Sequence, residues 1–174
     1  SFSQCPTFTV AAPIGTVVGC NPSTLPLMVV NTSVYTNVTY TWVSASTGTS
    51  TGQFINASSP TGSNTYTVLA SSPSSTCIAS QQITIVSNTI SPTVTVTPVT
   101  KTITCNGAPA TFTASSSTTV NVTGQWFGAF GVAAGPASAS PVIGSFNAPG
   151  TYTAVFTNVA NGCTNSQTIA VIGS

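Results

Sequence analysis

The stretch Asn37-Val38-Thr39-Tyr40-Thr41-Trp42 returns further along the chain as Asn121-Val122-Thr123-Gly124-Gln125-Trp126. A second stretch, Thr65-Tyr66-Thr67-Val68, returns in the same order as Thr151-Tyr152-Thr153-Ala154. The matched positions lie 84 to 86 residues apart. This order of landmarks indicates two copies of one unit of about 86 residues. Such a period is too long for a solenoid repeat and suits a small domain used in tandem.

Cysteines also stand at matching positions of the two copies. One cysteine precedes each tryptophan, and another follows each matched tyrosine by eleven positions. In chain order, these four residues are Cys20, Cys77, Cys105 and Cys163. We therefore predict a first domain over residues 1–89 and a second over residues 90–174.

Both copies have the residue pattern of β-strands. Apolar residues alternate with Thr with a period of two in Thr93–Thr97 and Ala110–Ala114, and in Leu25–Val29 the Leu and Val residues alternate with Pro26 and Met28. Clusters of Gly, Pro, Asn and Ser separate such runs, and Asn161-Gly162 suits a tight hairpin turn. No segment has helical periodicity. Short strands with regular turn signals predict an all-β fold, with about seven strands in two sheets per unit. We expect two tandem immunoglobulin-like β-sandwich domains, each with one disulfide.

The cysteines point to disulfide bonds in an oxidising, extracellular compartment, because no CxxC pair or histidine is present to complete a metal site. We expect Cys20 to pair with Cys77, and Cys105 with Cys163, since each pair would tie the second strand of a unit to its last. Cys5 is the odd cysteine. We expect it to be unpaired or bonded to another domain, in a chain that is a segment of a longer protein.

The composition excludes several functions. The 174 residues contain one Lys or Arg and no Asp, Glu or His, so the formal net charge is +1. The usual general acids and bases of enzymes are absent, and so are carboxylate or imidazole ligands for a metal. A single cation, Lys101, does not neutralise a nucleic acid backbone. We therefore expect no catalysis, no cofactor, no metal, no nucleic acid partner and no membrane insertion.

Single residues have structural or surface interpretations. We expect Trp42 and Trp126 in the two cores, Tyr66 and Tyr152 as structural corner tyrosines, and Lys101 as a solvated guard of a strand edge. The apolar stretch Phe127–Gly135 is the candidate for an exposed contact patch. Its candidate contact residues are Phe127, Phe130 and Val132.

The order of cysteine, Trp strand, Thr-Tyr-Thr and final strand resembles a known family. Gly150–Phe156 and Asn161–Thr164 carry this resemblance most strongly. They are similar to the immunoglobulin-like and PKD-like repeats of large surface adhesins of Bacteroidota, which use type IX secretion and include the gliding-motility adhesin SprB. The resemblance implies a non-catalytic repeat segment of a cell-surface adhesin or filament. It would act as a stiff stalk or an adhesive surface, with neighbouring repeats, like subunits or surface polysaccharide as partners.

Two other functions remain open. A self-assembling sheath or pilus subunit agrees with the near-zero net charge, because like-charge repulsion is missing. A carbohydrate-binding accessory module of a secreted protein would need exposed aromatic side chains in a row.

Overall fold

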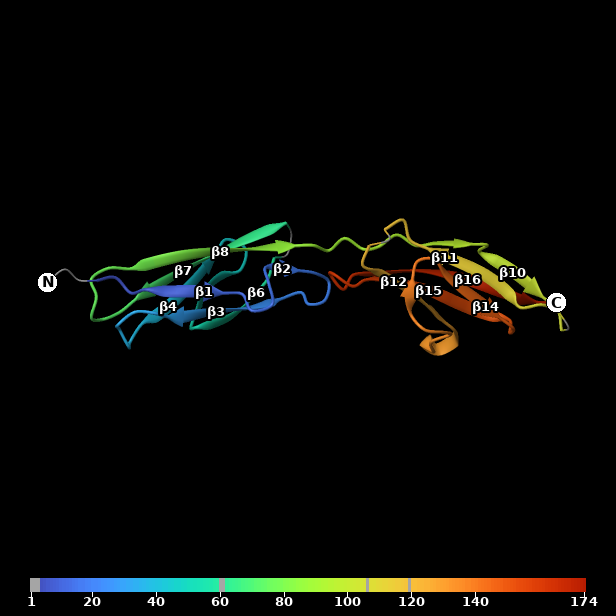
Figure 1. The fold of residues 1–174 in the computed structure, drawn as a ribbon, viewed down its shortest axis with the longest axis horizontal. Helices are drawn as coiled ribbons and strands as arrows, with labels where there is room; N and C mark the ends of the chain where they lie inside the picture. The colour runs from blue at the N-terminus through green and yellow to red at the C-terminus, as the bar shows by residue number, and fades with distance from the viewer. Residues whose placement is uncertain (1–3, 60–61, 106, 119) are drawn as a thin grey trace. The chain divides into compact units, whose positions relative to one another are not determined.

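The computed structural model describes residues 4–59, 62–105, 107–118 and 120–174. The chain divides into two compact units, Ser1–Thr89 and Ile90–Ser174. The described residues of each unit form eight strands in two sheets (Figure 1). The fold is all-β, as the alternating pattern predicts, and its helical content in the described residues is one 3-10 turn, η1 (Ala129–Gly131).

Unit 1 is a sandwich of a three-stranded and a five-stranded sheet. The three-stranded sheet has the order β1-β3-β6, and the five-stranded sheet has the order β2-β8-β7-β4-β5. Neighbours are antiparallel except for β2 and β8, which run parallel. The strands are β1 (Phe8–Ala11), β2 (Val17–Val18), β3 (Leu25–Asn31), β4 (Thr39–Ser44), β5 (Gly48–Thr51), β6 (Phe54–Ala57), β7 (Ser63–Ser71) and β8 (Ala79–Ser87).

Unit 2 repeats this architecture. Its sheets have the orders β14-β11-β9 and β10-β16-β15-β12-β13, and β10 runs parallel to β16. The strands are β9 (Thr95–Thr97), β10 (Thr100–Ile103), β11 (Ala110–Ser115), β12 (Val122–Phe127), β13 (Ser138–Ala139), β14 (Val142–Phe146), β15 (Gly150–Asn158) and β16 (Thr164–Gly173).

The first strand of each unit is split between the two sheets. In unit 1 the break contains Pro13 and Gly15, and in unit 2 it contains Pro98. Proline has no N–H to donate to a strand ladder, so pairing stops there and the chain crosses to the other sheet. Lys101 lies exposed on β10, at the edge of its sheet, which confirms its interpretation as a solvated edge residue.

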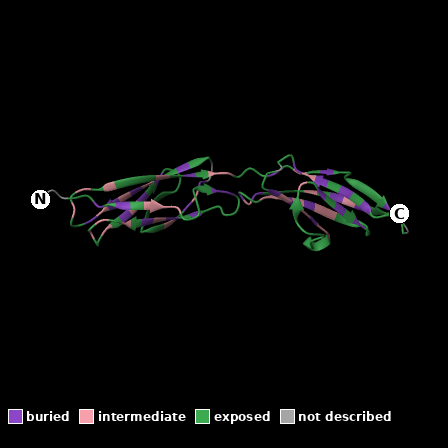
Figure 2. Cartoon of the chain, viewed as in Figure 1, coloured by how far each residue is buried: buried purple, intermediate pink, exposed green. Residues whose placement is uncertain are grey.

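Each core lies between its two sheets, where alternate residues of the strands meet (Figure 2). Trp42 and Trp126 are 1% and 2% exposed, which confirms their prediction as core residues. Their indole N–H groups donate to the carbonyls of Gly52 (3.0 Å) and Val142 (3.3 Å). The fold thus satisfies the polar atom of each tryptophan while burying its ring.

Three cross-strand pairs distribute side-chain volume differently in the two cores. Tyr40 of β4 faces Ala70 of β7, whereas at the matching positions Gly124 of β12 faces Phe156 of β15. At the second position, Leu25 faces Ala57 in unit 1 and Ala110 faces Phe146 in unit 2. At the third position, Leu27 faces Ile55 in unit 1 and Phe112 faces Gly144 in unit 2. A Cβ added to Gly124 would lie 2.7 Å from the Phe156 ring. Because cores tolerate substitution when total volume is kept, one fold accommodates both arrangements.

The corner tyrosines hold the chain before their own strands. The hydroxyl of Tyr66 donates to the Ser58 carbonyl (3.0 Å) and accepts from the Ser58 N–H (2.9 Å). The hydroxyl of Tyr152 donates to the Ala148 carbonyl at 3.1 Å. Both bonds reach backbone a few residues upstream, which confirms the structural interpretation.

The hydroxyl of Tyr40 differs from that of Tyr66, because it is buried and has no hydrogen-bond partner among the described residues. Burial raises the pKa of this phenol above its ordinary value of 10.0. At alkaline pH the unfolded chain ionises Tyr40 first. Ionisation of this phenol therefore leaves the free energy of unfolding unchanged below pH 10 and lowers it as the pH rises above that value.

We expect Tyr40→Phe and Tyr66→Phe to change stability in opposite directions. Removing the unpartnered hydroxyl should raise the free energy of unfolding of unit 1 by about 1 kcal/mol, and removing the bonded one should lower it by about 1–2 kcal/mol. Chemical denaturation followed by fluorescence measures both. A loss of stability in Tyr40→Phe would show that its hydroxyl has a partner after all.

The predicted disulfide pairings are wrong. Cys77 is bonded to Cys5, with a Cα–Cα distance of 5.3 Å, and Cys105 is an exposed free thiol. The expectation that Cys5 is unpaired or bonded to another domain is therefore also wrong. Cys20 and Cys163 are each disulfide-bonded.

The parallel register of the split strand explains both errors. Val18, two residues before Cys20, pairs with Ser87 near the end of β8, whereas Cys77 precedes the start of β8. Ten residues of extended chain span about 33 Å, and a disulfide needs Cα atoms within roughly 7 Å. Likewise, Ile103 pairs with Gly173 at the far end of β16, so Cys105 and Cys163 lie at opposite ends of that strand.

Candidate functional site

The candidate contact loop, residues 127–135, leaves the end of β12 and is closed by backbone hydrogen bonds. Gly128 N–H donates to the Val132 carbonyl, and Ala134 N–H donates to the Trp126 carbonyl, both at 2.8 Å. Phe127 and Ala133 form an isolated antiparallel bridge. The loop is thus built on the strand that carries the core tryptophan, which gives its tip a fixed base.

Phe130 is the most exposed large apolar residue of this loop. Its relative exposure is 104%, and η1, which contains it, is exposed throughout (Figure 2). Its φ angle is +62°, a left-handed conformation that is uncommon for a bulky side chain. An aromatic ring is therefore exposed to water on a strained backbone, and both features are unfavourable to the free energy of folding.

The three residues of the predicted patch differ in how far they are exposed. Val132 is 66% exposed, two positions after Phe130, whereas Phe127 is half-buried at the end of β12. The other residues of the loop are Gly and Ala. The side-chain amide of Gln125, on the preceding strand, donates to the Gly135 carbonyl at 2.8 Å. The patch is a small apolar surface without charge.

A second apolar surface, on unit 1, was missed by sequence reasoning. The outer face of the sheet β1-β3-β6 carries Ala11, Met28 and Phe54 in one cross-strand row, with Val30 beside them. Phe54 is 66% exposed and Val30 is 42% exposed. The signal lies in Leu25–Val30, where the outward positions of the alternation are apolar as well as the inward ones.

The matching outer face of unit 2 is hydroxyl-rich instead. Thr113 of β11 lies between Thr97 of β9 and Ile143 of β14. On either side of this row lie the cross-strand pairs Thr111–Ser145 and Ser115–Thr95. The two repeats therefore share a framework and present different surfaces, so surface properties are specific to each unit.

No metal-binding cluster is found in the part of the chain that the structure describes. Groups of three or more potential metal-ligating side chains are absent there. The described residues also contain no helix long and apolar enough to cross a membrane. Both tryptophans are buried, and among the described residues the exposed phenylalanines are Phe54 in unit 1 and Phe130 in unit 2. The two surfaces described above offer apolar contacts and uncharged hydrogen-bonding groups.

Neither a protein-family model nor a curated protein matches the sequence. Among solved structures, the chain is similar to the fibronectin(III)-like modules of CbhA from Clostridium thermocellum, with 11% identity and a TM-score of 0.52, over 97% of this chain and 94% of that chain. It is also similar to a chimeric titin Z1Z2-Z1Z2 tandem, with 16% identity and a TM-score of 0.39, over 97% and 99% of the two chains. A third similar structure is SGBP-B of Bacteroides ovatus, with 14% identity and a TM-score of 0.38, over 97% and 47%.

The similarity to the CbhA modules agrees with the sheet orders. Both observations show that each unit has the β-sandwich fold of immunoglobulin-like and fibronectin-III-like modules. Such a fold serves many roles, so the role has to be argued from the surfaces and strand ends of this chain.

Proposed function

We propose that the chain is a non-catalytic structural segment of an extracellular, cell-surface adhesin or filament. It acts as a stalk that also presents adhesive surface. The resemblance of its repeats to those of gliding-motility adhesins exported by type IX secretion supports this assignment, and the disulfide-bonded cysteines support an oxidising location.

The observation that carries the proposal is the position of the two chain ends within each unit. In unit 1 the chain enters at Cys5, beside the start of β8, and leaves after Ser87, at the other end of that strand. In unit 2 the incoming carbonyls of Ile90 and Pro92 accept hydrogen bonds from Asn161 and Asn165, near the start of β16. In each unit the chain therefore enters near the start of the last strand and leaves at the other end of that strand. This arrangement suits a module that transmits force along a series of domains.

Surface location is tested by labelling intact cells that make the protein with antibodies against the folded chain. We expect labelling without permeabilisation, and loss of the label after brief external proteolysis. Labelling that appears only after permeabilisation would contradict the proposal.

We expect Phe130→Ser to reduce adhesion of the purified chain by roughly tenfold or more, while leaving its stability unchanged, since the ring is fully exposed. The measurement is binding to the surface polysaccharide or to cells of the source, with thermal unfolding as the folding control. Phe54→Ser provides the matched control, because it removes an exposed ring from unit 1. Equal loss in both variants would show that general apolarity, and not the loop, governs adhesion.

Self-assembly is a second candidate, favoured by the formal net charge of +1. Here neighbouring copies of the chain are the partners. Sedimentation velocity at several protein concentrations distinguishes this function, since a self-assembling subunit forms larger species reversibly and a stalk segment remains a monomer.

A further inference from the structure

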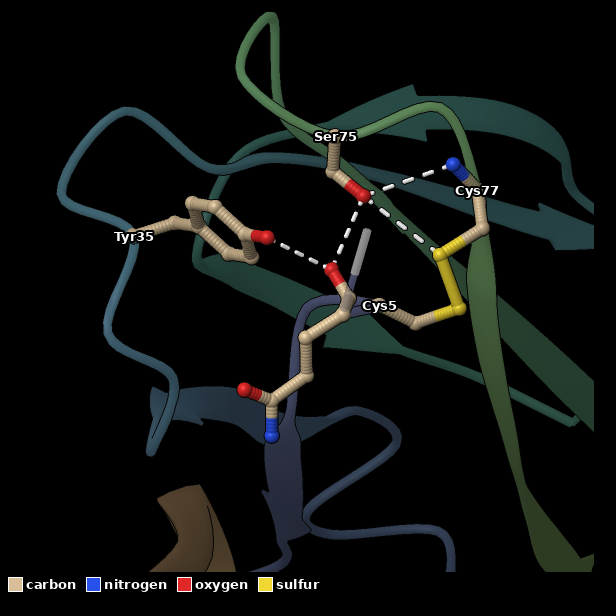
Figure 3. The surroundings of a disulfide bond; sticks show 5 residues. Cys5, Tyr35, Ser75 and Cys77 are labelled. Carbon is tan, nitrogen blue, oxygen red and sulfur yellow. Dashed lines mark hydrogen bonds between the residues drawn. A yellow bond between two sulfur atoms is a disulfide. The ribbon is translucent and has the colours of Figure 1, made fainter. Parts of the chain in front are cut away.

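The disulfide Cys5–Cys77 fastens the incoming chain of unit 1 to the segment before its last strand, β8. Figure 3 shows the bond beside hydrogen bonds on the same incoming segment. The carbonyl of Gln4 accepts from the hydroxyls of Tyr35 (2.7 Å) and Ser75 (3.0 Å). Cys77 N–H in turn donates to the Ser75 hydroxyl at 3.3 Å. In this unit, a cysteine near the start of the last strand is thus bonded to a cysteine that precedes the first strand.

Cys105 of unit 2 matches Cys20 of unit 1 in structure as well as in sequence. Each stands two residues beyond a strand that pairs parallel with the end of the last strand, after Val18 of β2 and after Ile103 of β10. Cys20 is disulfide-bonded, although the two other cysteines of unit 1 are bonded to each other. A cysteine at this position of the fold therefore forms a disulfide beyond the pair that its own unit supplies.

Cys105 is the exception among the matched cysteines. It is an exposed free thiol, whereas the other four cysteines, all in the described part of the chain, are disulfide-bonded. Among these four, Cys163 lies just before the last strand of unit 2 and is fully buried. Because the other four are engaged, a disulfide partner for Cys105 has to come from outside this copy of the chain.

The surroundings of Cys105 leave room for such a partner. A hollow of about 180 Å³ lies beside the thiol, and its lining includes Ile103, Pro149 and Ser174. Ser174 follows the end of β16, so the hollow is at the outgoing end of unit 2. Cys163 stands just before the start of β16, at the incoming end. The free thiol and the bonded cysteine of unit 2 are thus at opposite ends of its last strand.

We propose that Cys105 is a covalent attachment site, which forms a disulfide with the cysteine near the start of the last strand of another sandwich unit. In unit 1 the cysteine at that position, Cys77, is bonded at the incoming end. In a series of units, the outgoing end of one unit is followed by the incoming end of the next, so these two cysteine positions meet. The inference rests on the proposed function in this respect alone, since a stalk or filament sets units in series.

The partner cysteine has two sources, a second copy of this chain or a following unit of a longer chain. With a second copy, the Cys105 thiolate attacks the Cys77 sulfur, the S–S bond to Cys5 breaks, and Cys5 leaves as a thiolate that takes up a proton. No oxidant is consumed in that exchange. With a following unit that holds a free thiol, the two thiols lose two protons and two electrons to a disulfide-bearing oxidoreductase, whose own disulfide is reduced to two thiols.

A disulfide map of the protein isolated from its source tests the proposal. The cells are harvested in N-ethylmaleimide, which caps free thiols, and the protein is digested with pepsin at low pH without reduction, because protonated thiols do not exchange. Mass spectrometry should find the Cys105 peptide joined to a second cysteine peptide. A partner peptide that contains Cys77, in a species with at least twice the mass of one chain, identifies a second copy. A partner near the start of a last strand outside these 174 residues identifies a following unit.

Two results of the map would overturn the proposal. One is a Cys105 that carries maleimide or a small thiol. The other is a bond from Cys105 to a cysteine that does not stand near the start of a last strand, Cys105 of another copy included.

Cys105→Ser, made in the same cells, removes the thiol from an exposed position and should leave unit 2 folded. If the partner is a second copy, the cross-linked species should be lost from a non-reducing gel. If the partner is a following unit, its cysteine should now react with maleimide without reduction. Asn147→Ser is the matched control, because it changes another exposed residue of the hollow, retains the thiol and should keep the disulfide. A partner cysteine that stays protected in Cys105→Ser would also overturn the proposal.

These outcomes are separate from that of cell labelling. Labelling reports where the protein is located, and the disulfide map reports what Cys105 is bonded to. A surface-located protein with a capped Cys105 would overturn the covalent attachment alone. A linked protein that is labelled only after permeabilisation would overturn the surface location alone.

Discussion

Gly124→Tyr and Phe156→Ala are each expected to destabilise unit 2 strongly, and together to do so by much less than the sum of the two effects. Phe156 is fully buried, so its truncation should lower the free energy of unfolding by about 3–5 kcal/mol. A side chain at Gly124 would collide with the Phe156 ring and with Val142, at 2.7 and 2.8 Å from the new Cβ. The double variant places a large residue on β12 and a small one on β15, as in the Tyr40–Ala70 pair of unit 1.

A double-mutant cycle by chemical denaturation measures the coupling, which we expect to be about 2 kcal/mol or more in favour of the double variant. Gly128→Ala is a control on the adjoining loop, because the atom nearest to its added Cβ would be in the Tyr152 ring at 3.6 Å, which is an ordinary van der Waals contact. If the effects of the two substitutions on the free energy of unfolding are additive, the large residue cannot be moved from β15 to β12 at this pair. The backbones of the two repeats would then differ there.

Loss of the disulfide in Cys5→Ser/Cys77→Ser is expected to lower the free energy of unfolding of unit 1 by about 4 kcal/mol. The bond closes a long loop, with 72 positions between its ends, and so restricts the unfolded chain. A Trp126→Phe background leaves Trp42 as the fluorophore, so the transition of unit 1 is followed by itself. Cys105→Ser should change stability by less than about 0.5 kcal/mol, since this thiol is exposed and free. A double variant as stable as the wild type would contradict the chain-entropy account.

The sequence predicted the repeated framework because its signals are local. Alternation marked Leu25–Val29 and Ala110–Ala114, which form most of β3 and β11. The Asn161-Gly162 turn lies between β15 and β16, with Gly162 at a φ of +68° and the Asn161 side chain accepting from Cys163 N–H. Turn chemistry and a period of two are properties of a few neighbouring residues, so they are legible without knowledge of the fold.

The disulfide pairing could not be predicted from such local signals. The same alternating strands are compatible with a first strand that runs beside either end of the last one, and a pairing between Cys20 and Cys77 depends on which occurs. Parallel pairing of Val18 with Ser87 settled the question, by a contact between residues 69 positions apart. Similarly, the loop sequence suggested that Phe130 is exposed, but the apolar outer face around Met28 appeared only when three strands were placed side by side.

The sequence by itself determined the number of repeats, the strand pattern, the burial of Trp42 and Trp126 and the absence of acidic and imidazole groups, because each follows from residue identity or from short-range order. Only the tertiary structure decided which cysteines meet, which outer faces are apolar or hydroxyl-rich, and where each unit receives and releases the chain. The physical reason is that register and sheet order are set by the packing of whole strands across the core. The sequence of a single strand does not specify which strand will lie beside it.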